Sequence, residues 1–168
     1  GTVLEGPAEE SVPPTHALEA IDASDDGSVI VIGLEGTDRN VAVWGGLMTA
    51  GAVVNNLEGA VLDVAVRDVT EIKQDFDFPV FSRSVVPVTT VGRYKTIASN
   101  VPVECGGIMV NPSDLVVADA DGVVVVPKDH VDAVLEVALD IEDREAEQTK
   151  LIKEQKSLTK GLEKYNRI

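Results

Sequence analysis

The sequence predicts an α/β fold that ends in a long C-terminal helix. Short runs of valine, isoleucine and leucine recur before Pro127 between glycine, aspartate and proline, which is typical of strands separated by turns. A stretch of helical length, Trp44 to Asn55, lies between the first two of these runs and completes a β-α-β unit. After Pro127 the apolar residues recur at helical spacing, so the chain changes there from strands to helix.

The runs predict six strands, at Ser28–Ile32, Gly59–Val64, Pro79–Phe81, Val101–Val103, Leu115–Ala118 and Val123–Val126. Their nearly unbroken apolar character indicates that both faces of each strand are covered, and the four valines of Val123–Val126 are the clearest case. Gly1–Leu4 resembles the middle of a further strand, so we expect this domain to lack its N-terminal segment. Asp114, Asp119 and Asp121 are predicted to be turn residues, with a metal site as the alternative.

The C-terminal helix is predicted to occupy up to about forty residues, with Asp129 as its N-cap. An apolar stripe at helical spacing supports it, at Val131, Val134, Leu135, Ala138 and Ile141. Beyond Ile141 the stripe gives way to charged residues and resumes only weakly. The helix is therefore longer than the apolar stripe that could pack against its own domain. We therefore expect one domain over residues 1–168, with a helical arm at 128–168 that packs against another subunit.

Composition limits the classes of function. The 168 residues carry 29 acidic and 14 basic side chains and a net charge of −15, which opposes binding to nucleic acid or to an anionic membrane. The longest uncharged run, Asn40 to Leu57, contains three glycines, a threonine and three asparagines, too many polar positions for a membrane span. Cys105 is the single cysteine, which fits a reducing cytoplasm, and no signal peptide opens the chain.

An anionic substrate would need a specific cation in so acidic a chain. Six basic residues precede the C-terminal helix and form the short list of such cations: Arg39, Arg67, Lys73, Arg83, Arg93 and Lys95.

The most informative segment is Gly59 to Glu71, which begins as a buried strand and ends with Arg67, Asp68 and Glu71. The carboxyl end of a strand is where open α/β sheets bind ligands. A carboxylate there can ligate a hard cation, and a neighbouring guanidinium can hold a substrate carboxylate. The alternative is a surface ion pair followed by a helix-capping acid, and the spacing alone favours this alternative because Arg-Asp dipeptides are common.

Gly45 and Gly46 precede the predicted crossover helix, where backbone amides can approach an anion closely. The chain has no dinucleotide-binding glycine fingerprint and no phosphate-binding Walker loop, so a nucleotide cofactor lacks support. His16 and His130 are far apart in sequence and are predicted to be surface residues. Cys105 has no histidine near it in sequence and is predicted to be a structural thiol rather than a nucleophile.

Four segments together resemble the RraA-like family, which includes class II 4-hydroxy-4-methyl-2-oxoglutarate / 4-carboxy-4-hydroxy-2-oxoadipate aldolases and regulators of ribonuclease E activity. They are Asn40–Gly51, Gly59–Glu71, Val101–Gly107 and Asp119–Pro127. The aldolases of that family are marked by a glycine, twenty residues, Arg-Asp, two residues and an acid. Gly46, Arg67, Asp68 and Glu71 match this spacing in full.

The resemblance implies a swivelling β/β/α sandwich that assembles as a homotrimer or homohexamer with its active site at a subunit boundary. It implies that Asp68 ligates Mg²⁺ or Mn²⁺, that Arg67 contacts the pyruvyl group, and that the Gly45-Gly46 turn and the amides of Leu47 and Met48 bind the substrate carboxylate. Glu71, with an acid from a neighbouring subunit, would orient water at the metal.

The function expected on this basis is metal-dependent cleavage of a 4-hydroxy-2-oxo acid to pyruvate. Oxaloacetate decarboxylation should accompany it, because both reactions pass through the pyruvate enolate. The alternative is a non-catalytic regulator that binds an RNA-processing enzyme through its acidic surface. A third possibility is an oligomeric protein whose original activity has decayed.

Overall fold

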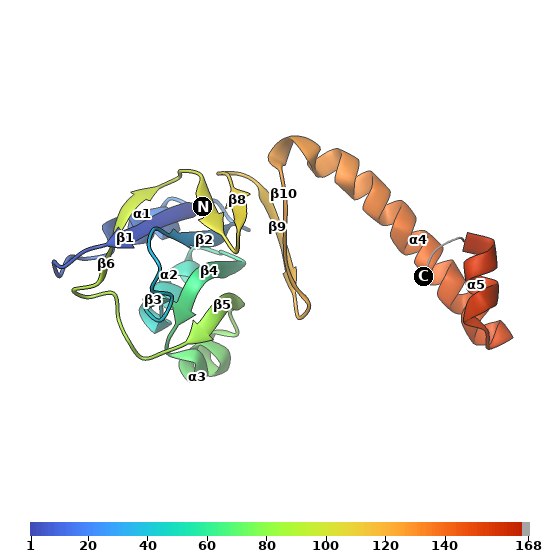
Figure 1. Cartoon of the computed structure of the whole chain (residues 1–168), viewed down its shortest axis with the longest axis horizontal. Coiled ribbons are helices and arrows are strands. Elements are labelled where there is room, and N and C mark those ends of the chain that lie inside the picture. The colour runs from blue at the N-terminus through green and yellow to red at the C-terminus, as the bar shows by residue number, and fades with distance from the viewer. Residues whose placement is uncertain (166–168) are drawn as a thin grey trace. The chain divides into compact units, whose positions relative to one another are not determined.

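A computed structural model gives the structure of residues 1–165 (Figure 1). The chain divides into two units, Gly1–Val125 and a second unit that begins at Val126. The first unit contains all the strands predicted to carry the site, and the second contains the C-terminal helices.

The first unit is built on a six-stranded sheet with the order β3-β4-β2-β1-β6, in which β5 also pairs with β4. Its strands are β1 (Thr2–Pro7), β2 (Val29–Leu34), β3 (Ala42–Trp44), β4 (Gly59–Val66), β5 (Val80–Val85) and β6 (Tyr94–Ser99). Every pair is parallel except β1 with β6. The carboxyl ends of β3 and β4 therefore meet at one edge of the sheet, where Trp44 pairs with Val66.

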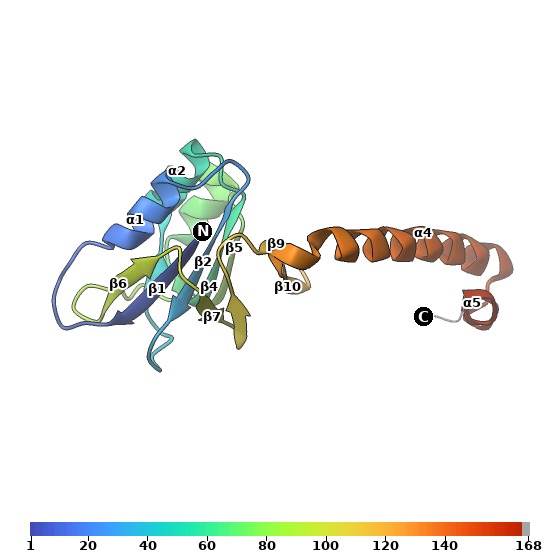
Figure 2. The same cartoon turned by 90° about the horizontal axis from the view of Figure 1, so that it is seen from above.

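Two helices and two small sheets cover opposite faces of this sheet (Figure 2). Helices α1 (Thr15–Asp22) and α2 (Gly46–Val54) bury Ala17, Ile21 and Ala52 in the larger apolar cluster. The other face carries β7 (Val103–Cys105) with β8 (Ile108–Val110), and β9 (Leu115–Asp119) with β10 (Gly122–Val126). This arrangement of two β layers and one helical layer confirms the predicted β/β/α sandwich.

Strand β4 lies at the centre, and all eight of its residues are buried. Ala60, Leu62, Val64 and Val66 face the helical layer, while Val61 joins the cluster on the opposite face. The alternation places Asp63 on the side of Val61, so a charged residue is buried within an otherwise apolar strand.

Five of the six predicted strands form, with changed ends, and the Gly1–Leu4 segment contributes to β1. The sixth, Val101–Val103, shares only Val103 with β7. The prediction missed α1, β3, α3 (Val69–Glu71), the π-helical turn Ile72–Phe76, β6 and β8. Trp44 ends β3 rather than beginning a helix, because the sheet extends into residues that have both strand and helix character. In β6, buried and exposed residues alternate over Tyr94–Ile97, but the polar Thr96 is buried and the apolar Ile97 is exposed, so the search for continuous apolar runs overlooked this strand.

The prediction that Val123–Val126 is covered on both faces is wrong. In residues 1–165, β10 pairs with β9 alone, so it forms a two-stranded ribbon rather than a central strand. Val124 is 61% exposed, while Val125 packs against the cluster that contains Val61. In the turn between these strands the backbone N–H of Asp121 donates to Oδ1 of Asp119 at 2.8 Å, which is the predicted turn chemistry.

The long C-terminal helix is present, but it is divided. After a 3₁₀ turn at Lys128–His130, α4 (Val131–Gln155) ends where Lys156 takes a left-handed backbone conformation, and α5 (Leu158–Tyr165) follows. The predicted N-cap role of Asp129 is wrong. The 3₁₀ turn contains Asp129, and the N–H of His130 donates to the carbonyl oxygen of Pro127 at 2.9 Å.

Within the second unit the apolar stripe of α4 is largely exposed, with Val134 45% and Leu135 53% accessible. Within residues 1–165, each helix is too short or too polar to cross a lipid bilayer.

Candidate active site

The candidate site forms where β4 ends beside the start of α2. The N–H of Arg67 donates to the carbonyl oxygen of Trp44 at 3.0 Å, so the sheet pairing continues for one residue and holds Arg67 beside the Gly45-Gly46 turn. Asp68 then takes a left-handed conformation, φ 59° and ψ 30°, which aspartate tolerates better than most residues. This turn redirects the chain into the short helix α3 (Val69–Glu71).

Asp68 is held by two donors that come from different parts of the chain. Its Oδ2 accepts a hydrogen bond from the N–H of Gly46 at 3.0 Å and lies 3.4 Å from Nε of Arg67. The side chains of Arg67 and Asp68 are 42% and 41% exposed, so a ligand can reach both. Within residues 1–165 both contacts are made to Oδ2, which leaves Oδ1 of Asp68 available to a cation.

The two glycines leave room for the charged side chains of the site, and unusual backbone angles are not the reason for them. A Cβ on Gly45 would lie 2.6 Å from Oδ2 of Asp68 and 3.0 Å from Nε of Arg67. A Cβ on Gly46 would lie 2.5 Å from Oε2 of Glu71. Gly45, Gly46, Arg67, Asp68 and Glu71 are therefore brought together, as the motif predicts.

Leu47 and Met48 follow in the first turn of α2, where backbone N–H groups have no acceptor within the helix. The side chain of Leu47 is 90% exposed and that of Met48 is half-buried. These first-turn amides, together with the guanidinium of Arg67, give this end of the sheet two kinds of donor for an anion.

A buried tryptophan supports the glycine turn from below. Nε1 of Trp44 donates to Oγ1 of Thr49 at 2.8 Å, and that hydroxyl donates to the carbonyl oxygen of Gly45 at 3.0 Å. The Trp44 ring is stacked on Phe78, with the ring centroids 6.2 Å apart. These contacts fix the backbone of the turn without occupying the donors that face the ligand.

A cavity of about 500 Å³ adjoins this turn. Its walls come from β1, α1, β3, the start of α2 and two loops, and the lining residues include Glu5, Trp44, Gly45, Leu47, Met48, Arg67 and Thr90. The sequence analysis identified the glycine turn and Arg67 but missed Glu5. One sequence feature could have identified Glu5. It is a charged residue two positions after the apolar Val3 in a strand, where the two side chains share a face.

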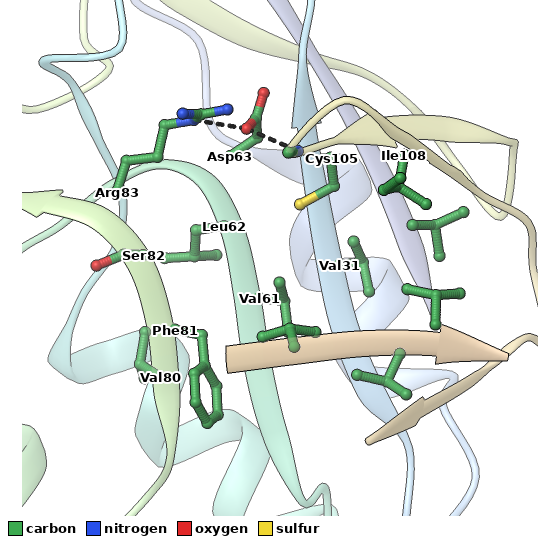
Figure 3. A pocket seen from close by; sticks show the side chains of 15 residues that line it. Val31, Val61, Leu62, Asp63, Val80, Phe81, Ser82, Arg83, Cys105 and Ile108 are labelled. Carbon is green, nitrogen blue, oxygen red and sulfur yellow. Dashed lines mark hydrogen bonds and ion pairs between the residues drawn. The ribbon is translucent and has the colours of Figure 1, made fainter. Parts of the chain in front are cut away.

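A second cavity, of about 610 Å³, lies on the opposite face of the sheet, and the sequence analysis missed it (Figure 3). Its walls are mostly apolar, and Asp63 and Arg83 lie together at one end. Oδ1 of Asp63 accepts from Nε of Arg83 at 2.7 Å and from the N–H of Gly106 at 2.9 Å, while Nη2 of Arg39 lies 3.1 Å from Oδ2. Two cations from the short list therefore form ion pairs with this buried aspartate.

Cys105 lines the second cavity and is half-buried. Burial and the nearby Asp63 carboxylate raise the pKa of its thiol to about 11, so the thiol stays protonated at neutral pH. A protonated thiol is a poor nucleophile, which agrees with the predicted structural role.

The residues at the β4 end fit a hard cation held by few protein ligands. Among residues 1–165, no group of three or more histidine, cysteine, aspartate or glutamate side chains is arranged as a metal cage. Mg²⁺ commonly binds through one or two carboxylates and completes its shell with water and substrate oxygens. The exposed carboxylate of Asp68, with Oδ1 available, is suited to that mode of binding.

A family model described as "RraA-like: Aldolase/RraA" matches residues 2–125, which include the whole sheet and the candidate site. The chain belongs to the RraA-like family. The family assignment confirms the resemblance seen in the sequence, and it covers the first structural unit but not the C-terminal helices.

Two relatives are similar over much of this RraA-like chain. An uncharacterized protein of Methanocaldococcus jannaschii is 39% identical over 105 residues, which cover 62% of the chain and 49% of that protein. A protein of Halalkalibacterium halodurans named "Putative 4-hydroxy-4-methyl-2-oxoglutarate aldolase" is 38% identical over 124 residues, which cover 72% of the chain and 56% of that protein. The chain spans about half the length of these relatives.

Solved structures share the fold of this RraA-like chain. An uncharacterized protein from Pseudomonas syringae superposes with a TM-score of 0.82 and 29% identity, covering 98% of the chain and 75% of that structure. Streptomyces coelicolor RraAS2, described as an unusual member of the RNase ES inhibitor RraA protein family, gives 0.80 and 27%, covering 90% and 75%. Aldolase and regulator names therefore both occur among its relatives.

Proposed function

We propose that this RraA-like chain is a divalent-metal-dependent aldolase that cleaves 4-hydroxy-2-oxo acids to pyruvate, with oxaloacetate decarboxylation as a side reaction. The observation that carries the proposal is the convergence of Arg67, Asp68 and the glycine turn at the end of β4. There, Oδ2 of Asp68 lies 3.0 Å from the N–H of Gly46 and 3.4 Å from Nε of Arg67. An oxygen ligand, a cation and helical amides are what binding of a 2-oxo acid at a metal requires.

The chemistry of cleavage assigns a task to each of these residues. Asp68 would hold Mg²⁺ or Mn²⁺, which acts as a Lewis acid on the 2-oxo group. Arg67 would bind the pyruvyl oxygens through its guanidinium as negative charge develops on the departing enolate. The amides of Leu47 and Met48 would orient the substrate carboxylate, and Glu71, beside Gly46, would orient water at the site.

The direct test is pyruvate release from 4-hydroxy-4-methyl-2-oxoglutarate and from oxaloacetate by the full chain, with added Mg²⁺ or Mn²⁺ and after chelation. We expect both substrates to release pyruvate only when the metal is present. Failure to release pyruvate from either substrate across several divalent metals would remove the aldolase proposal.

We further propose that the site is completed in a homotrimer or homohexamer. The exposed apolar stripe of α4, which includes Val134 and Leu135, supports this, because the second unit by itself does not cover it. Sedimentation velocity at micromolar concentration should give a trimer or a hexamer. A monomer would contradict a site shared between subunits.

A second candidate function is regulation of an RNA-processing enzyme. The net charge of −15 would favour a basic protein partner, and RraAS2 carries a name of that class. The two proposals differ in their dependence on Arg67, because a regulator of that kind has no developing enolate to stabilise. Both are consistent with the cytoplasm as the expected location.

A further inference from the structure

Glu5 is a buried carboxylate that has no charged partner within residues 1–165. It lies on β1, paired with Leu34 of β2 and Thr96 of β6, and is 1% exposed. Among residues 1–165, Oε2 of Glu5 has no hydrogen-bond partner. Burying a carboxylate in this way is costly, so such a group calls for an explanation beyond packing.

The Glu5 side chain lies on the ligand side of the sheet. Residues alternate along β1, so Glu5 shares a face with Val3, which belongs to the apolar cluster beneath the helices. Glu5 lines the same cavity of about 500 Å³ as Gly45, Met48 and Arg67. In the sheet order only β2 separates β1 from β4, so the two strands lie about 10 Å apart. Glu5 pairs with Leu34, two residues beyond the Ile32–Leu62 pair of β2 and β4, so Glu5 is level with Val64 and Arg67 lies three residues further along the direction of β4.

No neighbouring charge explains the burial of Glu5. The acidic and basic side chains on the elements packed against β1 are His16, Glu19 and Asp22 of α1, Glu35 after β2, Lys95 of β6 and Glu104 of β7. In the described part of the chain none of them forms an ion pair with Glu5, and His16 pairs with Glu19 instead. Arg67 is the one cation that lines the cavity, and its Nε is directed to Asp68.

The protonation of Glu5 suits proton transfer near neutral pH. Burial raises the pKa of its carboxyl from 4.5 to about 7. A general base is most effective when its pKa lies close to the working pH, because it is then both deprotonated and a strong proton acceptor.

We propose that Glu5 is the general base that accepts the C4 hydroxyl proton of the 4-hydroxy-2-oxo acid, an inference that rests on the aldolase function proposed above. The carboxylate takes the hydroxyl proton, and C4 becomes a carbonyl as the C3–C4 bond breaks. The bonding electron pair passes to the pyruvate enolate held at Arg67. The enolate then takes a proton from water, and Glu5 returns its proton to the hydroxide that remains.

Comparing two substrates separates this role from enolate stabilisation. Cleavage of 4-hydroxy-4-methyl-2-oxoglutarate requires loss of a hydroxyl proton, whereas decarboxylation of oxaloacetate forms the same enolate without one. We expect Glu5→Gln to lower kcat/KM for cleavage by about 10² to 10⁴ and to lower decarboxylation far less. Glu5→Asp, which keeps the carboxylate but shortens its reach, should lose less cleavage activity than Glu5→Gln.

Glu35→Gln is the matched control, because Glu35 is exposed and follows the neighbouring strand. The wild-type rate of cleavage should rise with pH through a group near 7, and this limb should be absent in Glu5→Gln. Equal losses in both reactions, or no loss in cleavage, would overturn the assignment of Glu5. Absence of both reactions in the wild type would instead contradict the aldolase proposal itself, so the two failures are distinguishable.

Discussion

The N–H of Gly46 donates a 3.0 Å hydrogen bond to Oδ2 of Asp68, and this bond joins the start of α2 to the end of β4. A motif with a fixed gap of twenty residues between glycine and arginine therefore has a structural reason. The intervening chain is one crossover helix and one strand, and the gap returns the Arg-Asp pair to the helix N-terminus.

Gly45→Ala should disable the site while the fold persists. The new Cβ would lie 2.6 Å from Oδ2 of Asp68, so the carboxylate must move away from the turn. A displacement of about 1 Å can cost about 10² in rate, and we expect a loss of pyruvate release of that size. Gly51→Ala is the control within the same helix, because its Cβ would meet only Ile21 at an ordinary 3.6 Å. Equal activity in both variants would show that the Gly45 contact does not matter.

Asp68→Asn should abolish metal-dependent turnover by removing the anionic oxygen ligand. Asparagine also tolerates the left-handed conformation at φ 59°, so the turn should be retained. We expect pyruvate release to fall by at least ~10²-fold, since a Lewis acid contributes several kcal/mol to the transition state. Binding of Mn²⁺, followed by electron paramagnetic resonance, should weaken in parallel. Full activity in the variant, or activity that survives chelation in the wild type, would contradict the proposed metal role.

Arg67→Lys separates catalysis from regulation. Lysine keeps the positive charge but loses the planar fork that binds two oxygens together. Both pyruvate-releasing reactions should slow by about 10² to 10³, while affinity for a basic protein partner should hardly change at a net charge of −15. If the variant kept full turnover but lost a protein complex, the regulatory function would become the better explanation.

Asp63→Asn should reduce stability rather than catalysis. Asp63 is 4% exposed and neutralises Arg39 and Arg83, so loss of its charge leaves two cations around a neutral amide. Because those arginines are partly exposed, water will screen them, and we expect the free energy of unfolding to fall by about 2–4 kcal/mol. Urea denaturation can measure the change, with the exposed Asp26→Asn as control. An unchanged midpoint would mean that this cluster contributes little to folding.

The sequence was most informative where chemistry and periodicity coincide. The β4 end could be predicted because a continuous apolar strand leads directly to Arg67 and Asp68. Glu5 could not, because it is buried between β2 and β6, where it pairs with Leu34 and Thr96, residues distant in sequence. The exposure of Val124 was missed for a related reason, since a run of valines does not show whether a strand has one neighbour or two.

Glu5→Gln should change how stability depends on pH. The pKa of Glu5 is raised from 4.5 to about 7 in the folded state, so between these values the folded chain holds a proton that the unfolded chain has lost. The contribution of Glu5 to stability therefore falls as pH rises from about 4.5 to 7, and the full penalty, about 3 kcal/mol, applies above 7. Glutamine cannot ionise and escapes this penalty.

We expect Glu5→Gln to match the wild type near pH 4.5 and to be more stable at pH 8, as judged by urea denaturation at both values. Glu35→Gln, whose site is exposed, should show no such divergence. If the difference between Glu5→Gln and the wild type were the same at both pH values, Glu5 would not be a buried acid that ionises near neutrality, and its role as a base would lose its physical foundation.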